Sequence, residues 1–454
     1  MLPGAAAHAE ALEARQSARQ VVVPTSDRRV RELLRSYYAP ITYFGESPAD
    51  RRARLHGLML ARGQPVAPIA EPEESDESDE EFYTEGSAAL LAARRRIAVA
   101  SLRSAKQRAA RQRAEAAVPL ATAASVRRAV LEPLKEYTSL GSQVAGERPI
   151  SAVRFSPDGS MLATGSWSGK AGVWSMPTAA PLSTLHGHED RVSGVAWHPR
   201  ATLTQPRSAV NLATGGGEGT VCLWSLESER PLRQLTGHEA RVARVAFHPL
   251  GDYVASASFD GTWRLWDVEH GRELLVQEGH SKEVYAIDFQ RDGALVASGG
   301  LDAIGRVWDC RTGRTAMVLD GHAREILGVS FAPNGYQVAS ASGDDTVRIW
   351  DLRRLRSVYT VPAHRSSVSD VRYFWGDAAV DGLSTAGLYF ATSGYDGLVK
   401  LWSAGDWQLV RTLSGDAGKV MSVDVARDGT LASGEWARTF KVSRWLTALG
   451  LYLI

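Results

Sequence analysis

The chain has little cysteine, no long apolar run and almost no net charge. Only Cys222 and Cys310 occur in 454 residues, with neither disulfide-framework nor metal-ligand spacing, so we expect a reducing compartment and no metal or other cofactor. No stretch approaches the roughly 20 apolar residues of a membrane span, and Glu10 and Glu13 are atypical of a signal or transit peptide. We therefore expect a soluble intracellular protein with no membrane partner. The net charge of +1 argues against a generic nucleic-acid binder.

The charge that is present is concentrated in the first 140 residues. Residues 71–81 hold eight acidic side chains and no basic one, and residues 94–113 hold eight basic side chains and no acidic one. Ser75 and Ser78 lie inside the acidic run and are candidates for an acid-directed kinase. Beyond residue 140 the chain consists of short Val-, Ala-, Leu- and Trp-rich strands separated by Gly-Asp turns, which predicts a domain boundary near that residue.

Internal repeats determine the expected fold. Gly-His pairs end at His188, His238, His280 and His322, with a variant Ala-His pair at His364, so the intervals between these histidines are 50, 42, 42 and 42. Each is followed by a strand that ends in tryptophan, at Trp224, Trp266, Trp308, Trp350 and Trp402. The same spacing predicts a degenerate repeat on either side, giving seven. The pattern resembles the WD40 family, which implies an all-β seven-bladed WD40 propeller with an α-helical, partly disordered N-terminal extension.

The repeated polar residues are interpreted as structural. A His, a strand Ser, a turn Asp and a Trp can form one hydrogen-bonded chain that satisfies buried polar groups. Three repeats supply complete sets, namely His238, Ser256, Asp260 and Trp266; His280, Ser298, Asp302 and Trp308; and His322, Ser340, Asp344 and Trp350. We expect no metal site or acid–base site there.

Three repeats depart from this pattern. The first has Gly146 and Ser168, the second has Glu218, and the seventh has Asp416, Ala437 and Ser443. Incomplete networks are therefore expected in these blades. We expect residues 138–145 to complete the last blade and close the ring, with the apolar tail beyond Trp445 as the alternative source of that strand.

Residues 24–60 read as two short helices around an apolar loop. The first should open at Thr25 or Ser26, and the second should have Pro48 at its first position. The loop at 39–46 is too small to form a core by itself, so it requires a partner protein or, alternatively, packing of the hairpin on the propeller.

Two N-terminal stretches carry a more specific resemblance. Residues 40–46 and 48–55 resemble the splicing-factor motif shared by two spliceosomal families, one of which is the U4/U6 WD-repeat family known as pre-mRNA processing factor four, or Prp-four. Residues 82–86 and 90–113 resemble that family's aromatic-Tyr-x-Glu-Gly segment and its basic helix. Propeller residues 241–245, 299–309 and 333–336 agree as well, so the resemblance spans about residue 10 to residue 443.

This resemblance implies a non-catalytic scaffold of the U4/U6 snRNP and the U4/U6.U5 tri-snRNP that acts in spliceosome assembly, located in the nucleus and its speckles. The implied partners are a Prp-three-type snRNP protein, a cyclophilin, the U4/U6 snRNA and other tri-snRNP proteins. The motif residues carried over for partner binding are Pro40, Ile41, Phe44, Gly45, Glu46, Arg51, Arg52 and Leu55. Those for the cyclophilin segment are Tyr83, Glu85, Gly86, Leu90, Leu91, Ile97 and Leu102, although Arg103 departs from the proline usual in the family. Candidate RNA contacts are Arg94, Arg95, Arg96, Arg103 and Arg108, with a solvated helix face as the alternative.

Two other function classes fit parts of the sequence less well. Trp308-Asp309-Cys310-Arg311 and Trp350-Asp351-Leu352-Arg353 match a pattern of cullin ubiquitin-ligase substrate receptors, but that interpretation leaves residues 24–60 unexplained. An enzyme is not expected, because no phosphate loop, nucleophile elbow, Cys–His pairing or metal cluster is found outside the repeat positions. The expected segments are 1–23 (helical or flexible), 24–60 (hairpin), 61–86 (acidic disordered linker), 87–137 (basic helical), 138–445 (propeller) and 446–454 (apolar tail).

Overall fold

The computed structural model describes residues 27–41, 48–62, 86–376, 379–414 and 418–445. The chain divides into two compact units, residues 1–80 and 81–454, each described here by itself. The first unit contains the helices α2 (Asp27–Ser36) and α3 (Pro48–Arg62), and the second contains α4 (Ala88–Ala116) and α5 (Leu120–Leu134) together with all the strands. None of the helices in the described ranges is long and apolar enough to cross a membrane.

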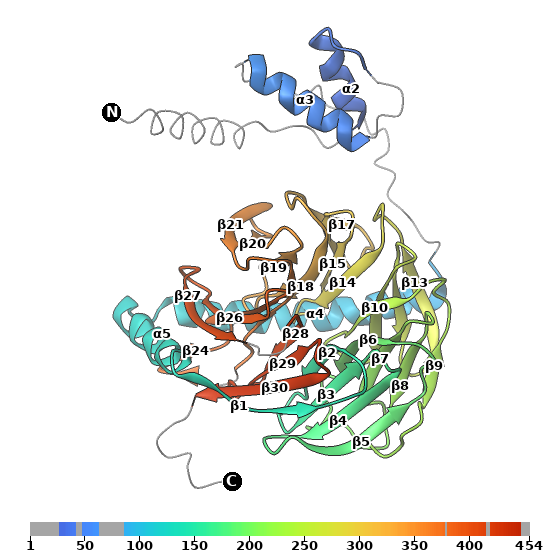
Figure 1. The fold of residues 1–454 in the computed structure, drawn as a ribbon, viewed down its shortest axis with the longest axis vertical. Helices are drawn as coiled ribbons and strands as arrows, with labels where there is room; N and C mark the ends of the chain where they lie inside the picture. The colour runs from blue at the N-terminus through green and yellow to red at the C-terminus, as the bar shows by residue number, and fades with distance from the viewer. Residues whose placement is uncertain (1–26, 42–47, 63–85, 377–378, 415–417, 446–454) are drawn as a thin grey trace. The chain divides into compact units, whose positions relative to one another are not determined.

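Seven four-stranded antiparallel sheets form the ring of the second unit (Figure 1). Blade 1 comprises β2 (Ile150–Phe155), β3 (Met161–Ser166), β4 (Lys170–Ser175) and β5 (Ala180–His186). Blade 2 comprises β6 (Val192–Trp197), β7 (Leu212–Gly216), β8 (Val221–Trp224) and β9 (Arg233–Leu235). Blade 3 comprises β10 (Val242–Phe247), β11 (Tyr253–Ser258), β12 (Trp263–Asp267) and β13 (Arg272–Gln277). Blade 4 comprises β14 (Val284–Phe289), β15 (Leu295–Gly300), β16 (Gly305–Asp309) and β17 (Thr315–Leu319).

The remaining blades follow the same order. Blade 5 comprises β18 (Ile326–Phe331), β19 (Gln337–Ser342), β20 (Thr346–Asp351) and β21 (Arg356–Pro362). Blade 6 comprises β22 (Val368–Tyr373), β25 (Tyr389–Gly394), β26 (Leu398–Ser403) and β27 (Leu409–Ser414), with the small hairpin β23 (Ala379–Val380) and β24 (Leu383–Ser384) inserted after its first strand. Blade 7 comprises β28 (Val420–Val425), β29 (Leu431–Glu435), β30 (Thr439–Trp445) and β1 (Tyr137–Val144). The predicted seven-bladed architecture is confirmed.

The burial of each strand follows its place in the blade. The first strand of a blade faces the channel and its neighbours, so every residue of β2 and β18 is buried, whereas the outermost strands β5 and β21 are mostly exposed. Clusters of apolar side chains fill the space between adjacent blades, as where Ala286 and Val307 of blade 4 pack with Val329 and Trp350 of blade 5. Because a sheet buried on both faces needs apolar side chains in both directions, these strands read as nearly continuous apolar runs.

The N-terminal strand of the propeller closes the ring. β1 pairs antiparallel with β30, from Tyr137 opposite Trp445 to Val144 opposite Thr439. This pairing covers an edge of β30 that would otherwise be open to other chains. The sequence-based prediction that residues 138–145 supply the closing strand is confirmed, and the tail at 446–454 lies outside the described residues.

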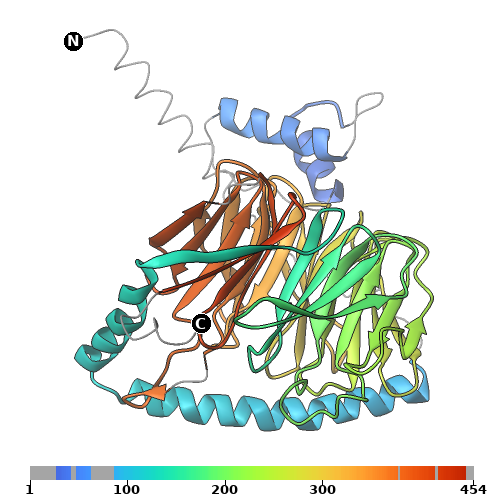
Figure 2. The same cartoon turned by 60° about the horizontal axis from the view of Figure 1, so that its bottom comes forward.

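Helix α4 packs against the propeller. Leu90, Ala93 and Ile97 are buried in one cluster with Trp263 of blade 3 and Trp308 of blade 4. In Figure 2, α4 runs across one end of the propeller, and α5 leads from it to β1. The expected domain boundary near residue 140 is therefore corrected: it marks the first strands, but α4 and α5 belong to the propeller unit, which begins at residue 81.

Candidate interaction surfaces

The polar residues that recur in the repeats form the expected hydrogen-bond chains in blades 3 to 5. In blade 3, His238 Nδ1 lies 2.6 Å from Asp260 Oδ2, and His238 Nε2 lies 2.7 Å from Ser256 Oγ, which also accepts the indole N–H of Trp266 at 2.8 Å. Blades 4 and 5 repeat this geometry with His280, Ser298, Asp302 and Trp308, and with His322, Ser340, Asp344 and Trp350. Each chain satisfies polar groups that would be costly to bury unpaired.

Two further blades have complete chains. In blade 2, Glu218 takes the place of Asp and its carboxylate bonds His188 Nδ1, while His188 Nε2 lies 2.7 Å from Thr214 Oγ1. The expectation of an incomplete network in blade 2 was wrong, because the longer Glu side chain still reaches the histidine. In blade 6, His364 bonds Asp396 at 2.9 Å and Thr392 at 2.9 Å.

The other two blades lack the chain, as expected. Blade 1 keeps only the bond from Trp174 to Thr164, at 3.0 Å. In blade 7, Ser443 stands where the other blades have tryptophan, and Asp416 lies outside the described residues.

Electrostatics agree with a structural role for these residues. Burial opposes the ionisation of Asp260, but the hydrogen bond and charge of His238 together with the hydrogen bonds from Thr262 hold the pKa of Asp260 well below its usual range. Burial raises the pKa of both cysteine thiols to about 12, so neither is activated. Within the described ranges, no group of three or more His, Cys, Asp or Glu is placed to hold a metal ion.

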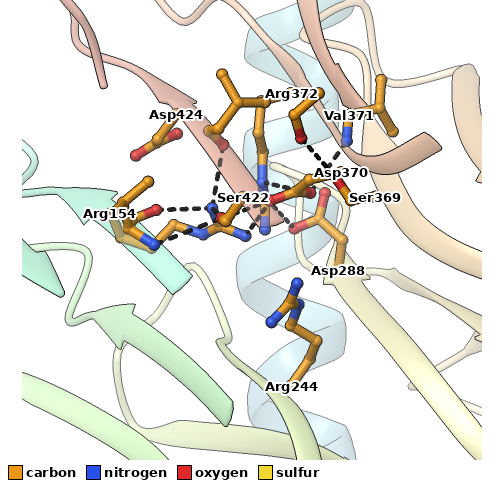
Figure 3. A network of polar contacts seen from close by, with 12 residues as sticks. Arg154, Arg244, Asp288, Ser369, Asp370, Val371, Arg372, Ser422 and Asp424 are labelled. Atoms are coloured by element: carbon orange, nitrogen blue, oxygen red, sulfur yellow. Dashed lines mark hydrogen bonds and ion pairs between the residues drawn. The ribbon is translucent and has the colours of Figure 1, made fainter. Parts of the chain in front are cut away.

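Three arginines and three aspartates lie around the central channel, and four of them form ion pairs with one another. Figure 3 shows Arg154, Arg244 and Arg372 converging with Asp288, Asp370 and Asp424 from the innermost strands. Arg154 Nη2 lies 3.0 Å from Asp370 Oδ2, and Ser422 Oγ donates to the same carboxylate oxygen at 2.8 Å. Arg372 lies 3.7 Å from Asp288 and 3.8 Å from Asp370. These ion pairs and the Ser422 hydrogen bond tie β2, β14, β22 and β28 together.

Burial and pairing compete within this network. Burial opposes the ionisation of Asp370, but Arg154, Arg372 and Arg244 together lower its pKa to about 2. At Asp288 and Asp424 burial outweighs the arginines, and their pKa values are raised. The sequence-based predictions did not include these residues. The repeat pattern could have indicated them. The fifth residue of the first strand of each blade is charged in four blades, at positions 154, 288, 372 and 424, and uncharged at 196, 246 and 330.

Polar contacts anchor α4 along turns of successive blades. Arg96 pairs with Asp252 at 2.8 Å, in the turn after β10. Arg108 pairs with Asp292 at 2.7 Å, in the equivalent turn of blade 4. Arg108 and Gln112 both donate to the carbonyl oxygen of Asn334 in the equivalent turn of blade 5, at 3.1 and 2.9 Å. These contacts hold α4 across one end of the propeller.

Contacts at both ends of the α4–α5 segment complete this anchoring. Ser87 caps α4 by accepting from the Leu90 N–H at 3.1 Å. At the other end, Glu115 accepts from the Ser384 N–H at 3.2 Å, and Arg127 of α5 donates to Asp406 at 2.7 Å. The whole segment is therefore attached to blades 3 to 6.

The structure divides the candidate cyclophilin residues. Leu90 and Ile97 are 1% and 0% exposed against the propeller, whereas Leu91 and Leu102 are 50% and 62% exposed. The predicted single apolar stripe is therefore corrected: α4 uses half of it to bind its own propeller and presents the other half outward. Gly86 is exposed, and Tyr83 and Glu85 lie outside the described residues.

The candidate RNA contacts are divided in the same way. Arg108 faces the propeller, with a side chain only 19% exposed and held by Asp292, and the guanidinium of Arg94 lies against Gly313. Arg95 and Arg103 are exposed, and Arg96 remains 60% exposed although it pairs with Asp252. The predicted set is corrected on this point: Arg108 serves as an anchor rather than as a free cation.

Helices α2 and α3 form the predicted hairpin with a small core of their own. Val30 and Leu34 of α2 pack with Leu55 and Met59 of α3, and all four are buried. Pro48 begins α3 as expected. Arg54 donates to the carbonyl oxygen of Pro40 at 2.7 Å and to that of Ile41 at 3.4 Å, which fixes the start of the connecting loop.

The motif residues lie partly within this hairpin. Leu55 is in its core and Arg51 is 4% exposed, so both support the fold of the hairpin. Arg52 and Ile41 are half-buried and Pro40 is exposed. Phe44, Gly45 and Glu46 lie outside the described residues.

Two family models match this chain, one over the propeller and one over the hairpin. The family model of the WD domain, G-beta repeat, matches residues 138–175, 179–225, 229–267, 271–309, 313–351 and 355–403, which is more than half of the chain. The chain therefore belongs to the WD40-repeat family. A second family model, pre-mRNA processing factor 4 (PRP4) like, matches residues 30–58, which lie on the hairpin.

Individual relatives point the same way. The chain is 42% identical over 206 residues to the U4/U6 small nuclear ribonucleoprotein Prp4 of Mus musculus, covering 44% of this chain and 40% of that protein. It is 42% identical to Prp4 of Homo sapiens over 198 residues (42% and 38%) and 34% identical to PRP4 of Saccharomyces cerevisiae over 186 residues (39% and 40%). The chain thus spans about two fifths of the length of these relatives. The cullin-receptor alternative gains no support from these relatives.

Proposed function

We propose that this chain is a non-catalytic scaffold of the U4/U6 snRNP and of the U4/U6.U5 tri-snRNP, acting in the nucleus in pre-mRNA splicing. The observation that carries the proposal is the presence, in one chain, of a PRP4-like match over residues 30–58 and a WD40 propeller at residues 137–445. Proteins named for the U4/U6 particle are 34–42% identical to this chain over 186 to 206 residues. WD40 repeats alone would not carry it, because that fold hosts many unrelated functions.

The α2–α3 hairpin is proposed as the contact for a Prp-three-type protein. It is a separate unit whose four-residue core is small, and a small core leaves much of a helical surface available to a partner. The loop that begins at Pro40 and Ile41 carries the motif, and Arg54 holds the two carbonyl groups at its start. The motif thus combines residues that build the hairpin, such as Leu55, with residues that remain available for contact, such as Pro40.

The outward side of α4 is proposed as the contact for the cyclophilin and for snRNA phosphates. Leu91 and Leu102 are its exposed apolar residues among those carried over from the family. Arg95 and Arg103 are exposed beside them, and guanidinium groups bind phosphate in bidentate fashion. Since Leu90, Ile97 and Arg108 hold the inner side of α4, a partner would meet the helix already docked.

The proposal assigns no catalysis. The repeated His–Asp pairs each bond a Ser or Thr hydroxyl and thereby a buried tryptophan, so they are committed to the fold. In the two sequences that suggested a cullin receptor, Arg311 and Arg353 are held by the preceding Asp309 and Asp351 at 2.7 and 2.8 Å.

Affinity purification of the tagged full chain from cell extract at moderate salt tests the proposal, followed by probing for small nuclear RNAs and by mass spectrometry. We expect U4 and U6 RNA together with a Prp-three-type protein. Recovery of a cullin adaptor without either RNA would overturn the proposal.

Matched variants assign the contacts. Deletion of residues 24–60 should abolish recovery of the Prp-three-type protein. Leu102→Asp should reduce cyclophilin recovery, whereas the control Leu120→Asp, at an 89% exposed residue of α5, should not. If Leu102→Asp and the unaltered chain recover equal amounts of cyclophilin, α4 is not the contact for the cyclophilin.

A further inference from the structure

Six of the seven blades hold a tryptophan in the same way. Its indole N–H donates to a hydroxyl group on the neighbouring strand of the blade, with Nε1–O distances of 2.8 to 3.0 Å. In blade 3 the pairing sets Val254 opposite Trp266 and Ser256 opposite Arg264. In blade 7 it sets Leu431 opposite Ser443 and Ser433 opposite Lys441. The hydroxyl group is therefore retained in blade 7, but the tryptophan is replaced by Ser443.

A cavity is present at this place. Its volume is about 240 Å³, and it lies between blade 6 and blade 7, where β27 adjoins β1. Ser433 and Ser443 line it from blade 7, and Val399 and Leu413 line it from blade 6. A cavity of about 150 Å³ is sufficient to bind benzene, so this one is large enough for an indole ring.

The cavity lining contains the polar partners that an indole would require. Among the described residues, the Ser433 hydroxyl shows no hydrogen bond, although its counterparts in the other blades each accept one from tryptophan. Lys441, which pairs with the buried Glu435 at 3.6 Å, occupies the position of Arg306 and Lys400. Those two cations lie over the tryptophan rings of their own blades, 5.9 Å from the ring centroid. Blade 7 thus retains a hydrogen-bond acceptor and a cation at the positions that hold tryptophan in other blades, although Ser443 stands in place of that tryptophan.

The cavity is open to a partner from the rim of the propeller. Thr138 and Ser139 of β1 and Thr412 and Ser414 of β27 line it and are exposed. All four are small polar residues at the outer strands of their blades. An incoming side chain can therefore enter between β1 and β27 past these four residues, with Tyr137 and Arg411 also lining the cavity.

We propose that this cavity is a binding site for a tryptophan side chain supplied by a partner protein. The indole N–H donates to Ser433 Oγ, the ring lies beneath Lys441, and its edges contact Val399, Leu413 and Leu431. This site is independent of the α2–α3 hairpin and of α4, so it stands or falls separately from the contacts proposed above.

Titration of the full chain with N-acetyl-tryptophanamide tests the proposal, with ligand-observed NMR as the readout and N-acetyl-leucinamide as the control ligand. Saturable binding of the tryptophan derivative alone is expected. Absence of saturation up to about 10 mM, which corresponds to less than about 3 kcal/mol of binding free energy, would overturn the proposal. So would equal binding of the leucine derivative.

Two variants locate the site. Ser443→Trp should fill the cavity from within, abolish binding and raise the unfolding midpoint. Ser433→Ala should weaken binding by about five- to tenfold through loss of one hydrogen bond, and this variant keeps the test valid if Ser443→Trp does not fold. Unchanged affinity in Ser433→Ala would contradict the assigned geometry. A chain that ends at residue 445 completes the test. If the tryptophan derivative binds only to this shorter chain, the cavity belongs to residues 446–454 of the chain itself, and the proposal of a partner's tryptophan is overturned.

Discussion

Replacing Ile97 with alanine tests whether α4 is an integral part of the propeller unit. Ile97 is 0% exposed, in a cluster with Trp263 and Trp308. Truncation of a fully buried Ile to Ala costs about 2–5 kcal/mol, and the better helix propensity of alanine returns about 0.5 kcal/mol. We therefore expect a net loss of about 2–4 kcal/mol in the free energy that holds α4 on the propeller. Val99→Ala is the matched control, because Val99 is also β-branched but is 64% exposed; it should change stability by less than about 0.5 kcal/mol.

Native-state hydrogen exchange of residues 88–116 measures this loss directly. Because each 1.4 kcal/mol corresponds to a factor of ten, amide exchange in α4 should accelerate by about 30- to 1000-fold in Ile97→Ala. Exchange should be nearly unchanged in Val99→Ala. Equal protection in the two variants would refute the docking of α4, and with it the division of α4 into an inner anchor and an outer contact surface.

Three further predictions concern the propeller itself. Burial lowers the pKa of His248 to about 4, so its neutral form stabilises the fold above pH 6.5 and that stability is lost as the pH falls toward 4; urea denaturation should show that His248→Gln reduces the loss between pH 7 and pH 5 by about 2 kcal/mol. Tyr137→Ala should cost about 3–5 kcal/mol at the closing strand, seen as earlier protease cleavage before residue 150, and resistance equal to that of the unaltered chain would contradict closure by β1. Asp370→Asn should leave the buried Arg154 without its anion and lower stability by about 3–5 kcal/mol, a loss that calorimetry would detect, whereas an unchanged melting temperature would show that the channel network is dispensable.

The sequence predicted those features whose causes are local or strictly periodic. The 42-residue spacing predicted the number of blades and the hydrogen-bond partners of His238, His280 and His322, because each of these hydrogen-bond chains lies within a single repeat. Pro48 marked the first residue of α3 because proline is favoured there. Ring closure by residues 138–145 was predictable because a seventh blade with three strands leaves an open edge.

Features that depend on distant parts of the chain could not be obtained in this way. Arg108 resembled the other arginines of α4 in sequence, and only the fold brings it to Asp292, 184 residues away. Leu90 and Leu91 are neighbours in sequence, yet one is buried and the other exposed because of where α4 meets blades 3 and 4. The network of Glu218 was misjudged from its residue type, since the reach of its side chain depends on the placement of His188.

Assembly of the tri-snRNP is the most direct test of the proposed scaffold role. The measurement is the amount of U4/U6.U5 particle, resolved on a native gradient and detected by its U4 RNA, in nuclear extract depleted of this protein and then restored with the purified chain. We predict that depletion removes the U4/U6.U5 peak, that the full chain restores it, and that a chain without residues 24–60 does not. An undiminished U4/U6.U5 peak after complete depletion would contradict the role as a scaffold.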